Sequence, residues 1–386
     1  MSTVNIDIKP NIINWALKQI DKEQLGEKML QNISKWINGD KKPTFNQVQE
    51  LSKKTHIPFG YFFLDKPPAY DIKLIEYRTV DSRELASPSR DLIDTIYEME
   101  NVQDWMRNYR KEEGFYELQI VGCLKNENDV HTIVEKIRTD IGLSENWFFS
   151  CKDKRYAFNY IRGLLEQAGI VVMVNGIVAT NTHRPLNVKE FRAFEMLDKW
   201  APLIFINNRD SNGAKVFSIF HEMAHIWLGE DDLYNDSFSY GQSVKSIEVI
   251  CNAVAGELIV PTEIFLQKWN EDKNNDIEDK ISDLSELFKC SRVVITRKAL
   301  DNQLINKAKY DSIVKYFTEH SKDIENNRVA GGDFYNTVKN RLDGNFATAL
   351  YNSVSSGNTT YTEAYRLTHT NKKTFDEVMS KFGGVL

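Results

Sequence analysis

Two histidines and a glutamate stand together in an apolar stretch of the chain. Residues 216–229, VFSIFHEMAHIWLG, carry His221, Glu222 and His225 among apolar side chains. At about 100° per residue, positions four apart lie about 40° apart around a helix, so both imidazoles leave one face. Tetrahedral Zn²⁺ takes two nitrogen ligands in this way, and Glu222 is placed to take a proton from the metal's water. The alternative is a buried helix with two hydrogen-bonded histidines, which would be costly because a carboxylate is buried with them.

A zinc site needs a third protein ligand, and the next amphipathic segment, Ser246–Ile259, offers two carboxylates. Glu248 and Glu257 are nine residues apart, which places them on opposite sides of a helix, so at most one faces the metal. Glu248 begins a face of small residues that permits close packing, whereas Glu257 precedes Pro261 and is predicted to face solvent. Glu248 is therefore the predicted third ligand, with water as the fourth. Without the nearby histidines, an exposed carboxylate in a first helical turn would be the ordinary interpretation.

Composition limits the class of protein. The chain has 386 residues, 41% hydrophobic and 27% charged, which is enough for two or three globular domains. A net charge of −6 argues against a general nucleic-acid coat. Four cysteines without a CxxC pair indicate reduced thiols in a cytosolic protein. We expect a cytoplasmic protein with no membrane partner, because the sequence shows no signal-peptide pattern and no apolar run of membrane-spanning length.

Short strands are predicted ahead of the histidine motif. The runs IVVMV, at 170–174, and Leu203–Asn207 are interpreted as buried strands. The polar sequence between them is interpreted as a loop, in which His183, Arg184 and Arg192 could line a cleft.

Helical spacing of apolar residues predicts further helices on both sides of the motif. An extended segment is expected at Leu74–Val80, and a hinge at Gly331–Gly332 ahead of a last group of helices. The further helical segments lie at 88–113, 128–143, 155–168 and 281–305.

The segment 281–305 has helix–turn–helix spacing, with Ser291 as the N-cap of its second helix. Arg292, Arg297 and Lys298 make the surface of this helix basic. Such a surface could grip a protein substrate or a phosphate backbone, and a solvated face is an equal alternative.

The first 64 residues are predicted to form a small helical bundle, with Thr44 as the N-cap of a helix that follows it. This segment has nine lysines and six acidic residues, a net charge of +3. Lys35, Lys41 and Lys42 bracket a turn, so contact with a DNA backbone and a solvated lysine face are equally compatible.

The sequence KWINGDKKPTFNQVQELSKKTHIPFGYFF resembles the helix-turn-helix of Xre-type regulators over roughly residues 10–64. In that family a Trp, a Gly and a Pro-Thr pair follow the recognition helix. The stretch LGEKMLQNISKW departs from the pattern because it has no clear turn between the two helices of the motif. A fused helix pair could pack without fitting a major groove.

The central region resembles the ImmA/IrrE family of zinc metallopeptidases over roughly residues 155–310. The family pattern is a hydrophobic lead-in, HExxH, and then a Glu-x-x-x-Asn helix that ends in Leu-x-x-Pro. The matching residues here are His221, Glu222, His225, Glu248, Asn252, Leu258 and Pro261.

The resemblance implies a zinc ion held by His221, His225 and Glu248, with Glu222 as the catalytic base. It implies a cytoplasmic endopeptidase that cleaves or controls a repressor-like protein, with a toxin as another possible partner. The rival hypothesis is an antitoxin-like regulator that binds DNA or a toxin and keeps the zinc fold mainly as a scaffold. An oxyanion donor is also expected, and the candidates by residue type are His183, Tyr234 and Tyr240.

The predicted fold is α+β and mainly α, with a gluzincin-like metallopeptidase core that contains a small sheet and the HExxH helix. Helical regions are expected at both ends of the chain. The predicted division is a helix-turn-helix bundle, a helical connector, the peptidase domain and a helical C-terminal region, at 1–66, 67–154, 155–325 and 326–386.

Overall fold

A computed structural model describes most of the chain, and the expected segments Leu74–Val80 and Gly331–Gly332 lie outside the described residues. The described residues are 4–20, 25–68, 88–229, 243–271, 276–325 and 333–382.

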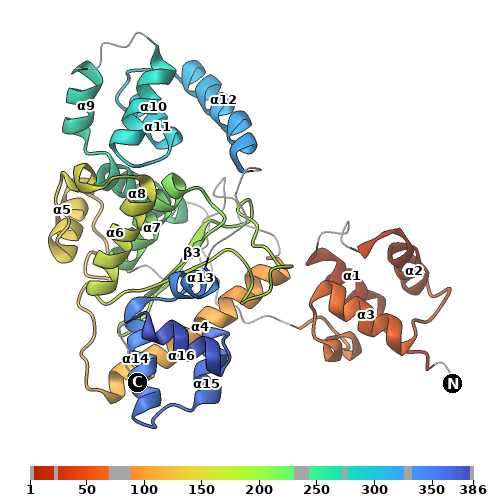
Figure 1. Ribbon diagram of the computed structural model, residues 1–386. Coiled ribbons are helices and arrows are strands. Elements are labelled where there is room, and N and C mark those ends of the chain that lie inside the picture. The colour runs from red at the N-terminus through yellow and green to blue at the C-terminus, as the bar shows by residue number, and fades with distance from the viewer. Residues whose placement is uncertain are drawn as a thin grey trace. The chain divides into compact units, whose positions relative to one another are not determined.

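The described residues form two compact units (Figure 1). The first contains the described residues up to 98, and the second contains residues from 99 onward. The four-part division made from the sequence stays a prediction.

The first unit is a small helical bundle. Its helices are α1 (Pro10–Lys18), α2 (Glu27–Ile37), α3 (Phe45–Thr55), the 3-10 helix η2 (Phe59–Phe63) and the first turns of α4 (Arg90–Glu112).

The helix boundaries in this unit follow the sequence signals. Thr44 accepts a hydrogen bond from the Gln47 backbone, and the Gln47 side chain accepts one from the Thr44 backbone. This reciprocal cap confirms the predicted N-cap. Helix α2 runs unbroken through the stretch where the sequence lacks a turn.

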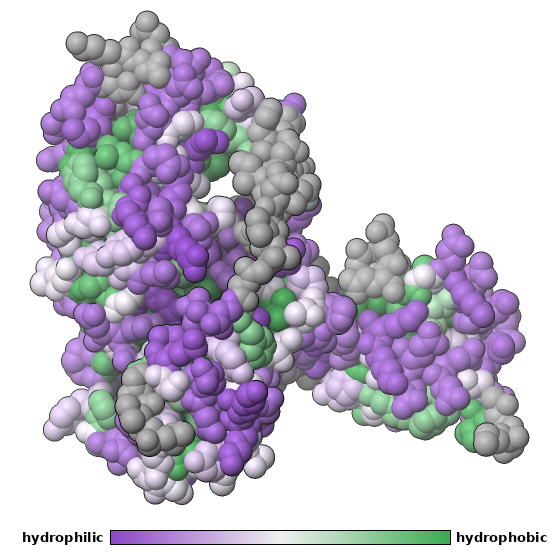
Figure 2. Space-filling model, in the orientation of Figure 1, coloured by the Kyte–Doolittle hydropathy of each residue, from purple (hydrophilic) through white to green (hydrophobic). Residues whose placement is uncertain are grey.

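Aromatic side chains are exposed on the first unit. Phe45 and Phe63 are 44% and 48% exposed, and Phe59 packs edge-to-face against both with ring centroids 5.0 Å apart. Figure 2 shows hydrophobic residues in green on this unit between hydrophilic ones.

The second unit is mainly helical around a small sheet, which confirms the α+β, mainly α class. It continues α4 and contains α5 (Val130–Ile141), η3 (Trp147–Ser150), α6 (Lys154–Gln167), β1 (Val171–Asn175), β2 (Ala193–Met196), β3 (Leu203–Asn207), α7 (Asn212–Leu228), α8 (Ser243–Ile259), α9 (Thr262–Glu271), α10 (Ile277–Leu287), α11 (Arg292–Asp301), α12 (Lys307–Glu325), α13 (Phe334–Arg341), α14 (Gly344–Ser355), α15 (Tyr361–Thr368) and α16 (Lys372–Ser380).

The sheet has the strand order β1-β3-β2. Strands β1 and β3 are parallel, and β2 pairs with β3 in the antiparallel direction. Both predicted strands are confirmed. The loop interpretation was wrong for residues 193–196, which form β2. This strand has only four residues, one of them the charged Glu195, so its apolar signal is weak.

Helix α7 lies in the centre of the second unit, against α6, α8 and the sheet (Figure 1). Ser211 caps its N-terminus, and Gly229 ends it with φ of 65° in the left-handed region. A turn from the segment that precedes α5 closes this end, because Gly122 and Leu124 donate backbone hydrogen bonds of 2.9 Å to the carbonyls of Ile226 and Trp227. The ends of the helix are therefore fixed from both directions.

The C-terminal helices attach to the edge of β1. The Val172 backbone N–H donates to Asp343 at 2.9 Å, and Arg162 donates to the Val172 carbonyl at 2.9 Å. Asp343 also caps α14 through the Phe346 N–H. These bonds satisfy backbone groups that an open strand edge would leave unpaired.

Glu166 makes this attachment sensitive to pH. Burial and the neighbouring Asp343 raise the pKa of Glu166 to about 7, although Arg162 opposes the change. The folded-state pKa of Glu166 lies above the ordinary 4.5. The contribution of its protonated form to folding stability is therefore complete below pH 4.5 and is lost as the pH rises through about 7. We expect the free energy of unfolding to fall by on the order of 1–3 kcal/mol between pH 5 and pH 8.

Urea unfolding at several pH values would measure this dependence. Glu166→Gln, which is neutral at every pH, is expected to flatten it. Glu286→Gln, a change to an exposed partner of Lys154, is the matched control and should keep the parent's dependence. An equal slope in the Glu166→Gln variant and the parent would show that another group is responsible.

No single helix in the described ranges is long and apolar enough to cross a membrane. Residues 247–259 of α8 pass this test only together with α9, and the pair bends by 55°. Val254, Leu258 and Phe265, from these two helices, are fully buried in the core, which accounts for their apolar character.

Candidate metal centre

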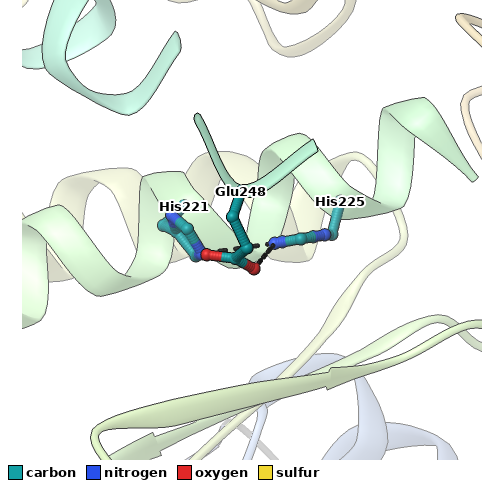
Figure 3. Close-up of side chains that lie close together, drawn as sticks. All are labelled: His221, His225 and Glu248. Carbon is teal, nitrogen blue, oxygen red and sulfur yellow. Dashed lines mark hydrogen bonds and ion pairs between the residues drawn. The ribbon is translucent and has the colours of Figure 1, made fainter. Parts of the chain in front are cut away.

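His221, His225 and Glu248 converge on one point between α7 and α8 (Figure 3). The Nε2 atoms of the two histidines are 3.2 Å apart. Glu248 Oε1 lies 3.2 Å from His225 Nε2, and Glu248 Oε2 lies 3.4 Å from His221 Nε2. With metal–ligand bonds of about 2.0–2.1 Å, the edges of a tetrahedron are about 3.3–3.4 Å long. The spacing of the two histidines therefore suits one edge of a tetrahedral metal site, and a Glu248 oxygen lies at a similar distance from each of them.

The local fold explains this convergence. The two histidines are one helical turn apart on α7, so their rings leave the same face. Glu248 comes from α8, which packs along α7. No other group of three or more possible metal-binding side chains is found in the described part of the chain. None of the described residues adds a fourth ligand to this group, and three protein ligands with an open fourth position are typical of catalytic zinc sites.

The Glu257 side chain does not face solvent, which corrects the sequence prediction. It is half-buried and accepts hydrogen bonds from the backbone and side chain of Thr262, at 2.8 and 2.6 Å. Lys298 pairs with it at 2.5 Å. Burial alone would raise its pKa, but Lys298 and Thr262 hold the pKa of Glu257 below its usual range. Glu257 thus caps the start of α9, away from the metal-binding group.

The same contacts remove Lys298 from the predicted basic surface on 281–305. Lys298 is largely buried against Glu257, and Arg297 pairs with Asp301 at 2.9 Å. Arg292 lies over the ring of Phe317. Lys298 is therefore not part of an exposed surface, whereas Arg292 and Arg297 are exposed. The predicted N-cap at Ser291 is confirmed.

The candidate centre is deeply buried on its α7 side. Glu222 is 1% exposed and both histidines are similarly covered, whereas the Glu248 side chain is 22% exposed. The exposed side of the centre is therefore that of Glu248. Glu222, the predicted base, lies on α7 directly beside His221.

Electrostatics at the centre favour a bound cation. Burial alone would raise the pKa of Glu248, but hydrogen bonds from both histidines hold that pKa well below its usual range. Burial by itself lowers the pKa of His225, but Cys251, Glu195 and Glu248 outweigh it and raise that pKa well above 6.5. A positive charge is thus stabilised where the three side chains meet, which suits a metal ion in place of the proton.

Two residues near His225 were missed by the sequence analysis. Cys251 lies one helical turn after Glu248, and burial raises the pKa of its thiol, although His225 opposes the change. It therefore stays protonated at neutral pH. Glu195, on β2, also acts electrostatically on His225. The spacing of Glu248 and Cys251 on one helix was a usable signal for the cysteine, whereas Glu195 needed the missed strand.

The remaining site candidates that the structure describes are not among the three converging side chains. His183 is exposed in the turn before β2 and is not part of the metal-binding group. Arg192 pairs with Asp210 at 2.7 Å and so supports the start of β2. Tyr234 and Tyr240 lie outside the described residues.

Removal of the Glu248 carboxylate is expected to weaken metal binding about 100-fold or more. Substitution of residues that only hydrogen bond to a metal ligand already lowers metal affinity about 10–100-fold, and loss of a ligand should lower it further. Metal analysis after dialysis against a weak chelator would measure this in Glu248→Gln. Glu257→Gln is the matched control on the same helix, and it should keep the parent's metal content. If Glu248→Gln holds the metal as tightly as the control does, Glu248 is not a ligand.

Sequence comparisons agree with part of this assignment. Residues 165–300 match the model of peptidase family M78, the IrrE N-terminal-like domain. This range contains β1 to α8 and so the candidate metal centre, which supports the ImmA/IrrE resemblance and a metallopeptidase-type regulatory protease. Residues 342–381 match a domain of unknown function (DUF8813). No curated protein and no solved structure matches the chain.

Proposed function

We propose that this protein is a zinc-dependent endopeptidase that cleaves or controls a repressor-like protein. The observation that carries the proposal is the triangle of His221, His225 and Glu248, with Glu222 beside it on the same helix. A structural zinc site has its fourth position closed by another protein ligand, and none of the described residues completes this one.

His221, His225 and Glu248 hold the zinc in this proposal. When bound, zinc lowers the pKa of a water molecule and polarises a carbonyl group. Glu222 accepts the water proton at its carboxylate and delivers it to the nitrogen of the leaving amine. Glu222 is 1% exposed, so bulk water screens its charge only weakly.

Cleavage is tested by incubating the zinc-loaded protein with a co-expressed candidate repressor and identifying fragments by mass spectrometry. The expected result is one or a few defined cuts that disappear after chelation and return with zinc. Identical fragments before and after chelation would point to another protease. The buried free thiols of Cys151, Cys251 and Cys290 support the proposed cytoplasmic location.

A second proposal concerns the first unit, where docking to a protein is favoured over reading DNA. Helix α2 is continuous, so the two helices of a groove-reading motif are not separated by a turn. Lys42 lies 3.2 Å from Asp7, which reduces the charge it offers to phosphates. The exposed Phe45 and Phe63 provide an apolar surface instead. This is the part of the chain on which the antitoxin-like alternative depends.

Salt dependence distinguishes the two interactions. If this unit bound DNA, Lys35→Ala and Lys41→Ala would each reduce the slope of log affinity against log salt by about one. We expect weak binding to the protein's own promoter, with little change on either substitution. Gel-shift titration at two salt concentrations measures this, and tight, sequence-selective binding would overturn the docking proposal.

A further inference from the structure

The helices α14, α15 and α16 form a small three-helix group that the metal centre does not explain. Each of the three packs against the other two, and they are drawn together in blue in Figure 1. The match to a domain of unknown function, over residues 342–381, contains all three helices. Their large apolar side chains are buried, among them Phe346, Leu350, Leu367, Phe375 and Val378. The group therefore has a core of its own and presents its outer helix faces to other molecules.

The connection between α15 and α16 is a turn of three residues, His369, Thr370 and Asn371. His369 has φ of 51°, in the left-handed region that histidine adopts more readily than most residues. The Thr370 backbone N–H donates to the Tyr365 carbonyl at 3.1 Å and ends α15. The Asn371 side chain accepts from the Thr374 N–H at 3.0 Å and starts α16. Two short helices joined by a capped turn of this length have helix-turn-helix spacing.

The start of α16 carries two exposed lysines, Lys372 and Lys373. They are its first two residues, where the positive end of the helix dipole makes a lysine unfavourable. Asp376 and Glu377 lie four residues further along, yet neither lysine forms an ion pair with any residue that the structure describes. Positive charge is therefore concentrated at the start of α16, and a bound anion would relieve the cost of placing it there.

The anion that suits this arrangement is duplex DNA. In helix-turn-helix proteins the second helix lies in the major groove with its N-terminal residues toward the DNA, and the preceding helix crosses the phosphate backbone. Lys372 and Lys373 are at the N-terminus of that second helix here. Tyr361, which is 50% exposed, and the exposed Thr362 begin α15 and offer hydroxyl groups to phosphates. Glu377, on the exposed face of α16, can accept a hydrogen bond from the amino group of cytosine.

We propose that α14, α15 and α16 form a DNA-binding unit whose α16 enters the major groove. Lys372 and Lys373 contact phosphates, and Glu377 contacts a base edge. This activity is additional to the proposed peptidase function and uses no residue of the metal centre. It is also separate from the first unit, so selective binding by α16 to a duplex other than the protein's own promoter is compatible with docking by that unit.

The test selects duplexes from a random pool with the full-length protein and titrates the selected duplex at several salt concentrations. We expect one enriched sequence. The Lys372→Ala, Lys373→Ala double variant should bind it about tenfold or more weakly, with a slope of log affinity against log salt reduced by about two. Alanine removes unfavourable charge from the start of the helix, so urea unfolding should show unchanged or raised stability.

The Lys35→Ala, Lys41→Ala double variant is the matched control, because it removes two exposed lysines from the first unit. It should keep the parent's affinity and salt slope. Loss of binding in this control would assign the DNA to the first unit and overturn the proposal. No enriched sequence, or equal affinity of the parent and the Lys372→Ala, Lys373→Ala variant, would overturn it as well.

Glu377→Gln tests whether α16 reads sequence. We expect the preference at one base position to change, because an acceptor for cytosine is lost. Tighter binding to every duplex with the same preference would show that Glu377 only repels phosphates. Equal binding of the parent to the selected duplex and to polyglutamate would show charge attraction alone. Either of these two results would overturn the proposal.

Discussion

Glu222→Gln is expected to keep its zinc and to lose peptide cleavage by about 10²-fold or more, the usual contribution of a general base. Gln has nearly the same shape as Glu and does not accept a proton at neutral pH. Glu222 is not one of the three converging side chains, so the metal-binding atoms keep their places. Cleavage rates of the co-expressed repressor, with zinc measured on the same samples, give both quantities.

Glu286→Gln serves as the control for this experiment, since it makes the same chemical change on an exposed side chain paired with Lys154. It should cleave at the parent's rate. If Glu222→Gln also cleaves at that rate, Glu222 is not the base. If it loses zinc together with activity, the separation between ligand and base is wrong.

The sequence was most informative where one short pattern determines both structure and chemistry. The spacing of His221 and His225 requires a helix, and α7 is that helix. Side-chain oxygen atoms at Thr44 and Ser291 predict where helices begin, because a cap satisfies exposed backbone N–H groups locally. These signals need no knowledge of distant residues, so they could be read without the fold.

Apart from Cys251, the misses depend on contacts outside the residue's own helix or strand. Glu257 was expected in solvent, but its partner Lys298 comes from a different helix. Glu195 was hidden because β2 is stabilised as a strand by pairing with β3 rather than by its own four residues. The attachment of Asp343 to Val172 joins residues that are 171 positions apart. Local periodicity contains no information about such pairs.

Gly229→Ala is expected to lower the free energy of unfolding of the second unit by about 2–4 kcal/mol. A Cβ atom at this position would lie 2.2 Å from the Gly122 Cα and 2.9 Å from its nitrogen. Both of these atoms are backbone, so no flexible side chain can move aside. The left-handed φ of 65° adds a conformational cost of about 1 kcal/mol for alanine. Overpacking of this kind typically costs 1–3 kcal/mol more.

Gly142→Ala separates the two contributions. Gly142 ends α5 with φ of 66°, yet a Cβ atom there would meet nothing within 4 Å. This variant should therefore lose only the conformational part, about 1 kcal/mol. Urea unfolding followed by tryptophan fluorescence gives both values. Equal losses in the two variants would show that the turn around Gly122 moves away at little cost.

The same substitution should reach the metal centre. The Gly122 turn binds the carbonyl of Ile226, which follows His225 directly, and Gly229 donates its backbone N–H to the His225 carbonyl at 2.8 Å. A displaced turn therefore shifts the end of α7 that carries one of the two imidazoles. We expect Gly229→Ala to lower zinc affinity as well as stability, whereas Gly142→Ala should leave zinc affinity unchanged. A Gly229→Ala protein that is destabilised but binds zinc like the parent would show that the ligand face of α7 is held by α8 and the sheet alone.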